Sequence, residues 1–230
     1  MQKIISQILL LGVGIVPLTV PLIAPANLQA QVSPSSSAEQ LYELGKWQAQ
    51  QQQEYQKAIQ TFQQVLPIAR KEQNKKLEAN TLLGLGVSYS NVGEEKLAIE
   101  SYNQALSLFK ELNDRSREAT TLNNLGNVYS NLGEKQKALE YYNQALPLIR
   151  AVGDRTKEAI TLINLGVVYS NLGEKQKTLE YYNQALLLFR AVGDQRGEAA
   201  TLNNLGAVYD DLGEKEKAQE YYNQALLLRK

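Results

Sequence analysis

Apolar residues in the middle of the chain recur every three or four positions. Between residues 119 and 133 they fall at Leu122, Leu125, Tyr129 and Leu132, which is the spacing of one buried helix face. Gly133 then interrupts the pattern, as a residue that tolerates positive φ does at a helix C-terminus. A second apolar face with the same spacing follows over residues 138–152. The pattern predicts two helices joined by a short turn.

A different boundary separates this helix pair from the next one. Gly153 ends the second helix and Asp154 follows as an N-cap, with Glu158 in the first turn, where a carboxylate favours the helix dipole. The same arrangement recurs at Asn113-Asp114 and Gly193-Asp194. No segment shows sustained alternation of period two, so we predict an all-α chain built from helix pairs.

The two-helix pattern repeats every 40 residues. Residues 119–158 and 159–198 are identical at most positions, and related copies precede and follow them. One residue of the second helix, small in most copies, marks each of them: Ala58, Ala98, Ala138, Thr178 and Ala218. Repetition at such a period is typical of solenoids, in which each unit packs on its neighbours. We predict an α-solenoid over residues 40–230, with copies near 40–78, 79–118, 119–158, 159–198 and 199–230.

Recurring small and aromatic residues indicate how each pair closes. A glycine inside a helix costs about 1 kcal/mol relative to alanine, so its recurrence predicts close helix contact. These glycines are Gly86, Gly126, Gly166 and Gly206. Aromatic residues of the second helices should fill the space between pairs: Phe62, Tyr102, Tyr142, Tyr182 and Tyr222. Thr178 should pack slightly worse than alanine, and Pro67 and Pro147 should kink their helices or shift the helix ends.

The order Leu-x-x-Leu-Gly-x-x-Tyr, followed by Ala, an aromatic residue and Ala, resembles the tetratricopeptide repeat. The matching residues are Leu122, Leu125, Gly126, Tyr129, Ala138, Tyr142 and Ala145. The 40-residue form resembles kinesin light chain, Pins-type adaptors and the repeat arrays of cyanobacterial proteins associated with CHAT domains. The resemblance covers about residues 40–230. It implies a right-handed superhelix of about five repeats that binds a partner's peptide or helix in a concave groove and has no catalytic role.

In that family the first helix of each pair lines the groove, which gives candidate residues for this chain. They project beside the buried stripe: Leu83, Gly84 and Val87 in the second copy, Asn123, Asn124 and Asn127 in the third, Ile163, Asn164 and Val167 in the fourth, and Asn203, Asn204 and Ala207 in the fifth. We expect no recognition of a C-terminal carboxylate, because the lysines that clamp one in chaperone-binding relatives are replaced by Leu83, Asn123 and Ile163.

Asn124, Asn164 and Asn204 occupy one repeat position and form a ladder of amides. An amide donates and accepts hydrogen bonds together, so the ladder matches the backbone of an extended peptide. In the kinesin-light-chain-like relatives this residue contacts ligand backbone. The alternative is that these residues are tolerated on a solvated face or bond within the helix pairs. Both interpretations are open at this point.

The amino-acid composition excludes several kinds of catalytic and metal-binding site. The chain has 24 basic and 24 acidic residues, no Cys and no His. Thiolate nucleophiles, disulfides and Cys-ligated zinc are excluded, and the commonest general base and transition-metal ligand is missing. The balanced charge argues against nucleic-acid binding, which requires excess Lys and Arg. We expect no cofactor and no catalytic residue.

Residues 1–30 form a separate segment. Lys3 precedes a long apolar run, and small residues end it at Ala30, as in a secretory signal peptide. We predict cleavage after Ala30, with Ala26 as an alternative position, and therefore a periplasmic or extracellular protein. The other interpretation is a membrane anchor over residues 4–26, although three prolines would weaken such a helix. Residues 31–39 are predicted to be a flexible linker.

The last copy differs from the others in its outward residues. Gln219 replaces an apolar residue, and Asp210-Asp211 replace Ser-Asn, whereas Leu226 to Leu228 could form an exposed apolar strip. We expect either a self-capped monomer or end-to-end pairing of two solenoids. The leading function is a protein-interaction scaffold. The alternatives are a self-assembling structural module and a regulatory subunit of an enzyme on a separate chain.

Overall fold

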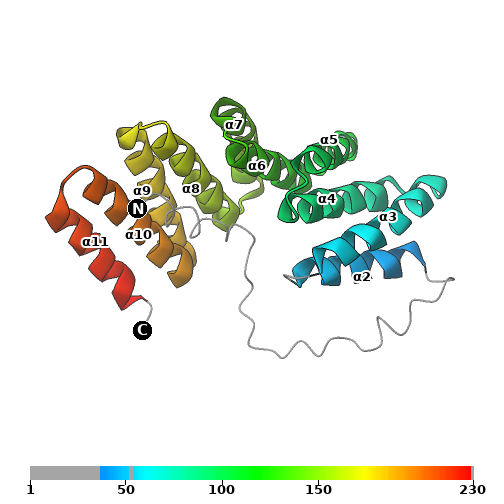
Figure 1. The fold of residues 1–230 in the computed structure, drawn as a ribbon, viewed down its shortest axis with the longest axis horizontal. Helices are drawn as coiled ribbons and strands as arrows, with labels where there is room; N and C mark the ends of the chain where they lie inside the picture. The colour runs from blue at the N-terminus through cyan, green and yellow to red at the C-terminus, as the bar shows by residue number, and fades with distance from the viewer. Residues whose placement is uncertain (1–36, 52–53, 229–230) are drawn as a thin grey trace.

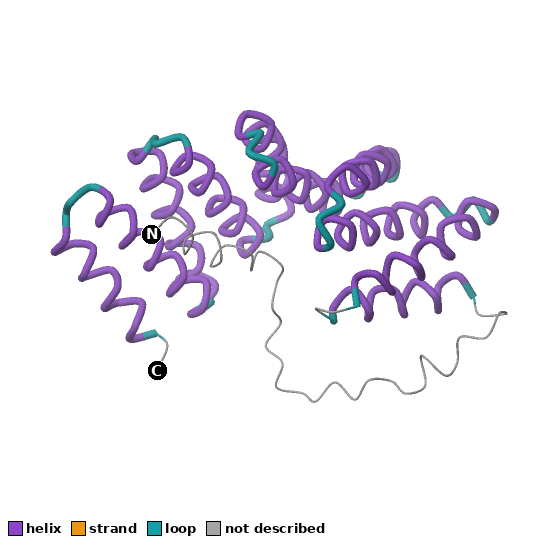
Figure 2. The backbone as a smooth tube through the Cα atoms, viewed as in Figure 1, coloured by secondary structure: helices purple, strands orange, loops and turns teal. Residues whose placement is uncertain are grey.

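The structure is a computed structural model that describes residues 37–51 and 54–228. Every regular element in this part of the chain is an α helix, as the periodicity predicts (Figure 2). The first helices of the pairs are α2 (Ala38–Gln50), α4 (Lys75–Asn91), α6 (Arg115–Asn131), α8 (Arg155–Asn171) and α10 (Gln195–Asp211). The second helices are α3 (Tyr55–Lys71), α5 (Glu95–Glu111), α7 (Lys135–Val152), α9 (Lys175–Val192) and α11 (Lys215–Leu227).

The five pairs follow one another along an arch (Figure 1). Each second helix packs on the first helices on either side of it, as α7 does on α6 and α8. First helices of neighbouring pairs also contact one another, as α4 does α6 and α6 does α8. Figure 1 shows α6 on the inner side of the arch and α7 on its outer side. The fold is therefore an α-solenoid whose first helices line the concave side.

The turns end and start helices as the sequence predicts. Gly133, between α6 and α7, has φ +77°, the left-handed region where a side chain would be strained. Asp154 caps α8, since its carboxylate accepts the N–H of Lys157 at 3.0 Å. Asn74 caps α4 in the same way, after Gln73 at φ +55°. This last boundary lacks the Gly-Asp or Asn-Asp pair and was not predicted.

The core of a pair depends on a ring that lies against a helix backbone. A Cβ on Gly126 would lie 2.5 Å from Cε1 of Tyr142, closer than carbon atoms approach, so the ring of α7 needs glycine on α6. Tyr142 is 2% exposed and also packs with Ala159 and Leu162 of α8. The predicted role of this ring between neighbouring pairs is confirmed. Thr178 is fully buried as well, and its hydroxyl donates to the carbonyl of Glu174 at 3.1 Å.

The first pair makes the same contact in a shifted register. Gly45 of α2 would place a Cβ 2.6 Å from Cε1 of Phe62. It stands thirteen residues before Ala58, whereas Gly126 stands twelve before Ala138. The turn from α2 to α3 is correspondingly one residue longer than the turn from α4 to α5. An extra residue before Glu54 therefore shifts α2 by one position from the 40-residue period that the rest of the chain follows.

Helix α2 differs from the other first helices in its charge. It begins at Ala38, two residues before the expected start of the repeat domain, because Ser37 accepts the N–H of Gln40 and completes a capping box. Glu43 and Lys46 lie on its exposed surface, and the ammonium group of Lys46 is 2.8 Å from a carboxylate oxygen of Glu43. Counted from its glycine, Glu43 occupies the position that Asn124 holds in α6.

The two prolines were predicted to kink their helices or shift the helix ends, but the helix ends are not shifted. Pro147 lies inside α7, which has the same extent as α9, where leucine stands at this position. Pro67 lies inside α3 in the same way. Both rings are exposed on the outer side of their helices. Pro147 has no N–H to donate to the carbonyl of Asn143, and Pro67 has none for the carbonyl of Gln63; both of these residues are exposed. Water can satisfy such carbonyls, so the helix continues.

Several predictions concern residues outside the described part. The signal peptide at 1–30, the alternative anchor at 4–26 and all but the last three residues of the 31–39 linker lie there. Over the residues that the structure describes, no helix is both long and apolar enough to span a membrane. The same residues contain no cluster of acidic side chains suited to a metal ion.

Candidate interaction surface

The predicted groove residues lie together on the first helices along the concave side. We call them the inner surface: Leu83, Gly84 and Val87 on α4, Asn123, Asn124 and Asn127 on α6, Ile163, Asn164 and Val167 on α8, and Asn203, Asn204 and Ala207 on α10. All are half-buried except Ala207, which is exposed. Because part of each of these side chains is exposed to solvent, a partner can contact them without any change in the fold.

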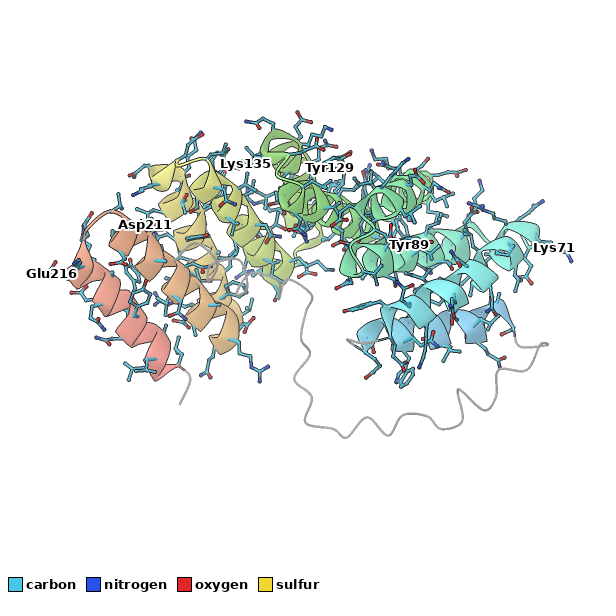
Figure 3. The ribbon with its side chains drawn as sticks, in the orientation of Figure 1. Lys71, Tyr89, Tyr129, Lys135, Asp211 and Glu216 are labelled. Atoms are coloured by element: carbon cyan, nitrogen blue, oxygen red, sulfur yellow. The ribbon has the colours of Figure 1, made fainter. Side chains whose placement is uncertain are left out.

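The inner surface carries almost no charge. Residues 79–93, 119–133 and 159–173 contain no Asp, Glu, Lys or Arg, and residues 199–213 contain only Asp210 and Asp211. From α4 onward the charged residues lie on the second helices and at the helix ends, where many are paired, as Lys177 is with Glu174 at 2.6 Å. Figure 3 shows Asp211 at the end of α10 and Glu216 on α11. The concave side is therefore a surface for hydrogen bonds and apolar contacts.

Part of the amide ladder is used inside the protein. The Oδ1 of Asn127 accepts the hydroxyl of Tyr142 at 2.6 Å and the Nδ2 amide of Asn164 at 3.0 Å. This network joins α6, α7 and α8, so Asn164 links two neighbouring pairs. Burial raises the pKa of Tyr142, which keeps the hydroxyl protonated and able to donate.

The other amides show the same tendency. Burial raises the pKa of the Tyr102 hydroxyl on the preceding helix, and the side chain of Asn124 offsets part of that rise. Asn123 accepts the hydroxyl of Thr161 at 3.0 Å. The sequence left open whether the ladder binds a ligand or bonds internally, and the structure shows internal bonds for Asn164 of the ladder and for its neighbours Asn123 and Asn127. Each bond uses only part of an amide's capacity, since an amide has two N–H groups and an oxygen with two lone pairs.

The first junction explains why the ladder is missing on α4. There the second helix presents Phe62, which has no hydroxyl, and α4 has Gly84 where later helices have asparagine. A Cβ on Gly84 would lie 2.6 Å from Cζ of Phe62. The amide is therefore present where a tyrosine hydroxyl faces the next pair and absent where a phenylalanine ring does. This pairing was not recognised from the sequence, although it is visible there once the contact is known.

A second tyrosine contact was also missed. The ring of Tyr141 stacks on that of Tyr129, with centroids 5.3 Å apart and planes 5° apart, and Lys137 lies 4.9 Å from the Tyr129 centroid. Tyr129 is marked on α6 in Figure 3. The same stack recurs at Tyr169 with Tyr181 and at Tyr209 with Tyr221. It braces the turn within each of the last three pairs, and so these rings are structural rather than a platform for a ligand.

Charges at the junctions are paired rather than merely solvated. Arg150, at the end of α7, donates its Nε to Glu158 of α8 at 2.6 Å. Arg70 with Glu78 and Arg190 with Glu198 make the equivalent bond at 2.7 Å. The arginine side chains remain about half exposed, so each pair contributes little to the free energy of unfolding.

The far end of the solenoid exposes a position that is buried elsewhere. Leu226 of α11 is 58% exposed, whereas Leu106, Leu146 and Leu186 at the same repeat position are 9%, 8% and 5% exposed. Tyr222 is half-buried, because no following helix covers it in the described structure. The predicted apolar strip thus includes Leu226 and Leu227, and Leu228 is half-buried.

Comparison with known families identifies the repeat. The sequence profile described as tetratricopeptide repeat matches residues 37–111, 77–151, 117–186 and 157–230. Together these windows cover the whole solenoid. A search of curated protein sequences finds no significant match.

Solved structures share the fold. BtubC (BKLC) from P. vanneervenii is 25% identical, with a TM-score of 0.74 over 90% of this chain and 82% of that one. A candidate kinesin light chain from P. anserina with nearly identical repeats is 18% identical, with a TM-score of 0.68 over 83% of this chain and 94% of that one. MamA is 25% identical, with a TM-score of 0.58 over 76% of this chain and 89% of that one.

Proposed function

Because the chain belongs to the tetratricopeptide repeat family, whose fold is generally a non-catalytic scaffold for protein interactions, we propose that its inner surface binds a peptide or helix of a partner protein. Asn side chains hold the backbone of that segment, and Leu, Val and Ile provide apolar contact. A regulatory subunit of an enzyme on a separate chain would use the same surface in the same way.

The observation that carries this proposal is the uncharged inner surface with amide capacity to spare. Asn164 donates one hydrogen bond to Asn127, which leaves a second N–H and its oxygen for a ligand. The neighbouring half-buried Ile163 and Val167 supply apolar area that a partner can cover. A backbone bound by amides contributes affinity, and the apolar contacts on either side contribute specificity.

Capture of partners with matched variants tests the proposal. The full chain is compared with Asn124→Ala, Asn164→Ala and Asn204→Ala combined. The control combines Asn103→Ala, Asn143→Ala and Asn183→Ala, which remove the same amide from exposed positions of the outer helices. We expect a partner that the control retains and the inner variant loses. A partner held equally by all three proteins would contradict binding at the inner surface.

The inner variant also removes bonds inside the protein, so a second variant separates binding from folding. Ala207 is exposed on α10, and Ala207→Trp blocks the surface without removing a hydrogen bond. Thermal unfolding of each protein is measured alongside the capture. Loss of the partner in both variants, with the melting temperature of Ala207→Trp unchanged, assigns the loss to the surface itself.

A second candidate function is self-assembly, and the exposure of Leu226 favours it. Pairing of two chains through α11 would cover this leucine as a following helix pair covers its equivalents. Sedimentation of the full chain across a range of concentrations tests this, with Leu226→Glu as the variant that should abolish pairing. A chain that stays monomeric at the highest concentration rules pairing out.

We also propose that the protein is exported and that cleavage follows Ala30. The basis is the apolar segment with small residues at its end. The mass of the N-terminal peptide from the source cell decides the matter. A mature terminus at Gln31 supports export, and a peptide that still contains residues 4–26 supports the anchor instead.

A further inference from the structure

The inner surface is not uniform along the arch. On α4 it presents Leu83 and Val87, and on α8 it presents Ile163 and Val167, all half-buried. We call Leu83 with Val87 and Ile163 with Val167 the two apolar stations. Between them, α6 presents Asn123 and Asn127. A ligand that follows the concave side from α4 to α8 therefore meets apolar, polar and again apolar side chains.

Two carboxylates lie beside the far end of the inner surface, and the ammonium group of Lys175 donates to the backbone carbonyl of Asp211. Asp210 and Asp211 are exposed on α10, where the preceding first helices have Ser-Asn. Asp210 follows Ala207 by three residues and Asn203 by seven, which places it on the same helix face as those two. Burial, with the charges of Asp210 and then Asp211, raises the pKa of Tyr222.

The distances between these stations follow from helix packing. First helices are in contact from α4 to α6 and from α6 to α8, and packed helices lie about 8–10 Å apart. We use the same spacing from α8 to α10, because the sequence period is the same there. Two such steps separate α4 from α8, and one step separates α8 from α10. An extended chain rises about 3.3 Å per residue, so the stations are spaced by about six residues and then by about three.

We propose that the partner segment is an extended peptide with two apolar residues about six positions apart and a Lys or Arg about three positions beyond the second. The apolar residues contact the stations on α4 and α8, and the basic side chain pairs with Asp210 and Asp211. The body between them is uncharged, because a charged residue would lose water against a surface with no counter-charge. This inference rests on the proposed function and adds the chemistry and direction of the ligand.

The chain supplies its own conservative variant for a test. Asp210→Ser with Asp211→Asn restores the Ser-Asn of the three preceding pairs, so the fold accepts it. The control, Glu216→Gln with Glu220→Gln, removes the same charge from exposed positions of α11. A library of random twelve-residue peptides is selected on the full chain and on both variants. A third variant, Val87→Lys with Val167→Lys, places charges at both apolar stations.

We expect peptides from the wild-type chain and from the control to share the two apolar positions and the basic residue. Peptides from the Asp210→Ser, Asp211→Asn variant should keep the apolar spacing and lose the basic preference. A synthetic consensus peptide should bind the wild-type chain about two- to fivefold more tightly than its Lys→Glu counterpart at low salt, as for an exposed ion pair.

The possible outcomes distinguish failure of this inference from failure of the proposed function, which is binding of a partner segment at the inner surface. Peptides that lose binding to the Val87→Lys, Val167→Lys variant but show no basic preference overturn the inference and leave the inner surface as the binding site. Peptides that bind this variant as well as the wild type, or no enrichment at all, overturn both.

Discussion

The first and third junctions of the solenoid place an aromatic ring between two helix pairs in different ways. At the first junction Phe62 lies between Gly45 and Gly84, two positions without a side chain. At the third, Tyr142 lies against Gly126 and directs its hydroxyl to Asn127, which also receives the amide of Asn164. Both junctions share the Arg–Glu pair and an Asn or Asp cap on the following helix.

The difference shows that the identity of the ring determines which residue can face it on the next helix pair. A phenylalanine needs space alone, so glycine suffices on the next helix. A buried tyrosine also needs a partner for its hydroxyl, because a buried donor without an acceptor is costly. At the third junction this partner is Asn127, and Asn164 of the ladder donates to the same oxygen, so the ladder residue has a structural role there.

The largest effect should come from removing the ring. Tyr142→Ala should lower the free energy of unfolding by about 3–5 kcal/mol, because it leaves a cavity between three helices. Tyr222→Ala is the matched change at the half-buried end position and should cost much less. Urea unfolding compares them, and equal losses would mean that the ring's burial does not set its contribution.

The next effect should come from exchanging the facing residues. Gly84→Asn brings a side chain against Phe62 and should cost about 1–3 kcal/mol through overpacking. Asn164→Gly, the reverse change, should cost about 1 kcal/mol from glycine in a helix, together with the lost bond to Asn127. Thermal unfolding measures both, and a neutral Gly84→Asn would contradict the contact at the first junction.

A smaller effect isolates the hydroxyl. Tyr142→Phe keeps the ring and should cost about 0.5–1.5 kcal/mol, whereas Phe62 already lacks the group. The double variant Tyr142→Phe with Asn127→Ala should cost less than the sum of the two single changes, because the single changes remove the same bond. Strict additivity in urea unfolding would show that the two side chains are not coupled.

The smallest effect should be common to both junctions. Arg150→Gln and Arg70→Gln should each cost less than about 1 kcal/mol, since the arginines are about half exposed. Salt should reduce both costs, because it screens exposed pairs. Measurements at low and high ionic strength check this, and a large loss that salt does not change would indicate a packing role for the arginine stem.

Much of the fold could be predicted from local features of the sequence. The period of 40 is visible when the copies are compared. The glycine turns and the contact of Gly126 with Tyr142 follow from spacing within one copy. The family profile and the solved structures confirm the repeat type. The inner-surface residues lie on the first helices, and their contact with a ligand stays a prediction.

The remaining features depend on contacts between elements. The bond from Asn164 to Asn127 joins residues 37 positions apart, and its geometry depends on how two pairs pack. The stack of Tyr129 on Tyr141 depends on the angle of a turn in the same way. The register of α2 was hidden because one added residue breaks the period before Glu54. Pro147 was expected to kink its helix or shift the helix end, but the end is not shifted, because an exposed carbonyl needs no protein partner.

The charged face of α2 limits how copies of this protein can associate. If another chain's α11 docked there, Glu43 and Lys46 would have to leave water, whereas α6, α8 and α10 have an uncharged asparagine at the position of Glu43. Head-to-tail docking of this kind is the step that would propagate a filament without end. Pairing of two α11 ends would leave Glu43 and Lys46 in place and avoid this cost, which favours a closed pair over a filament.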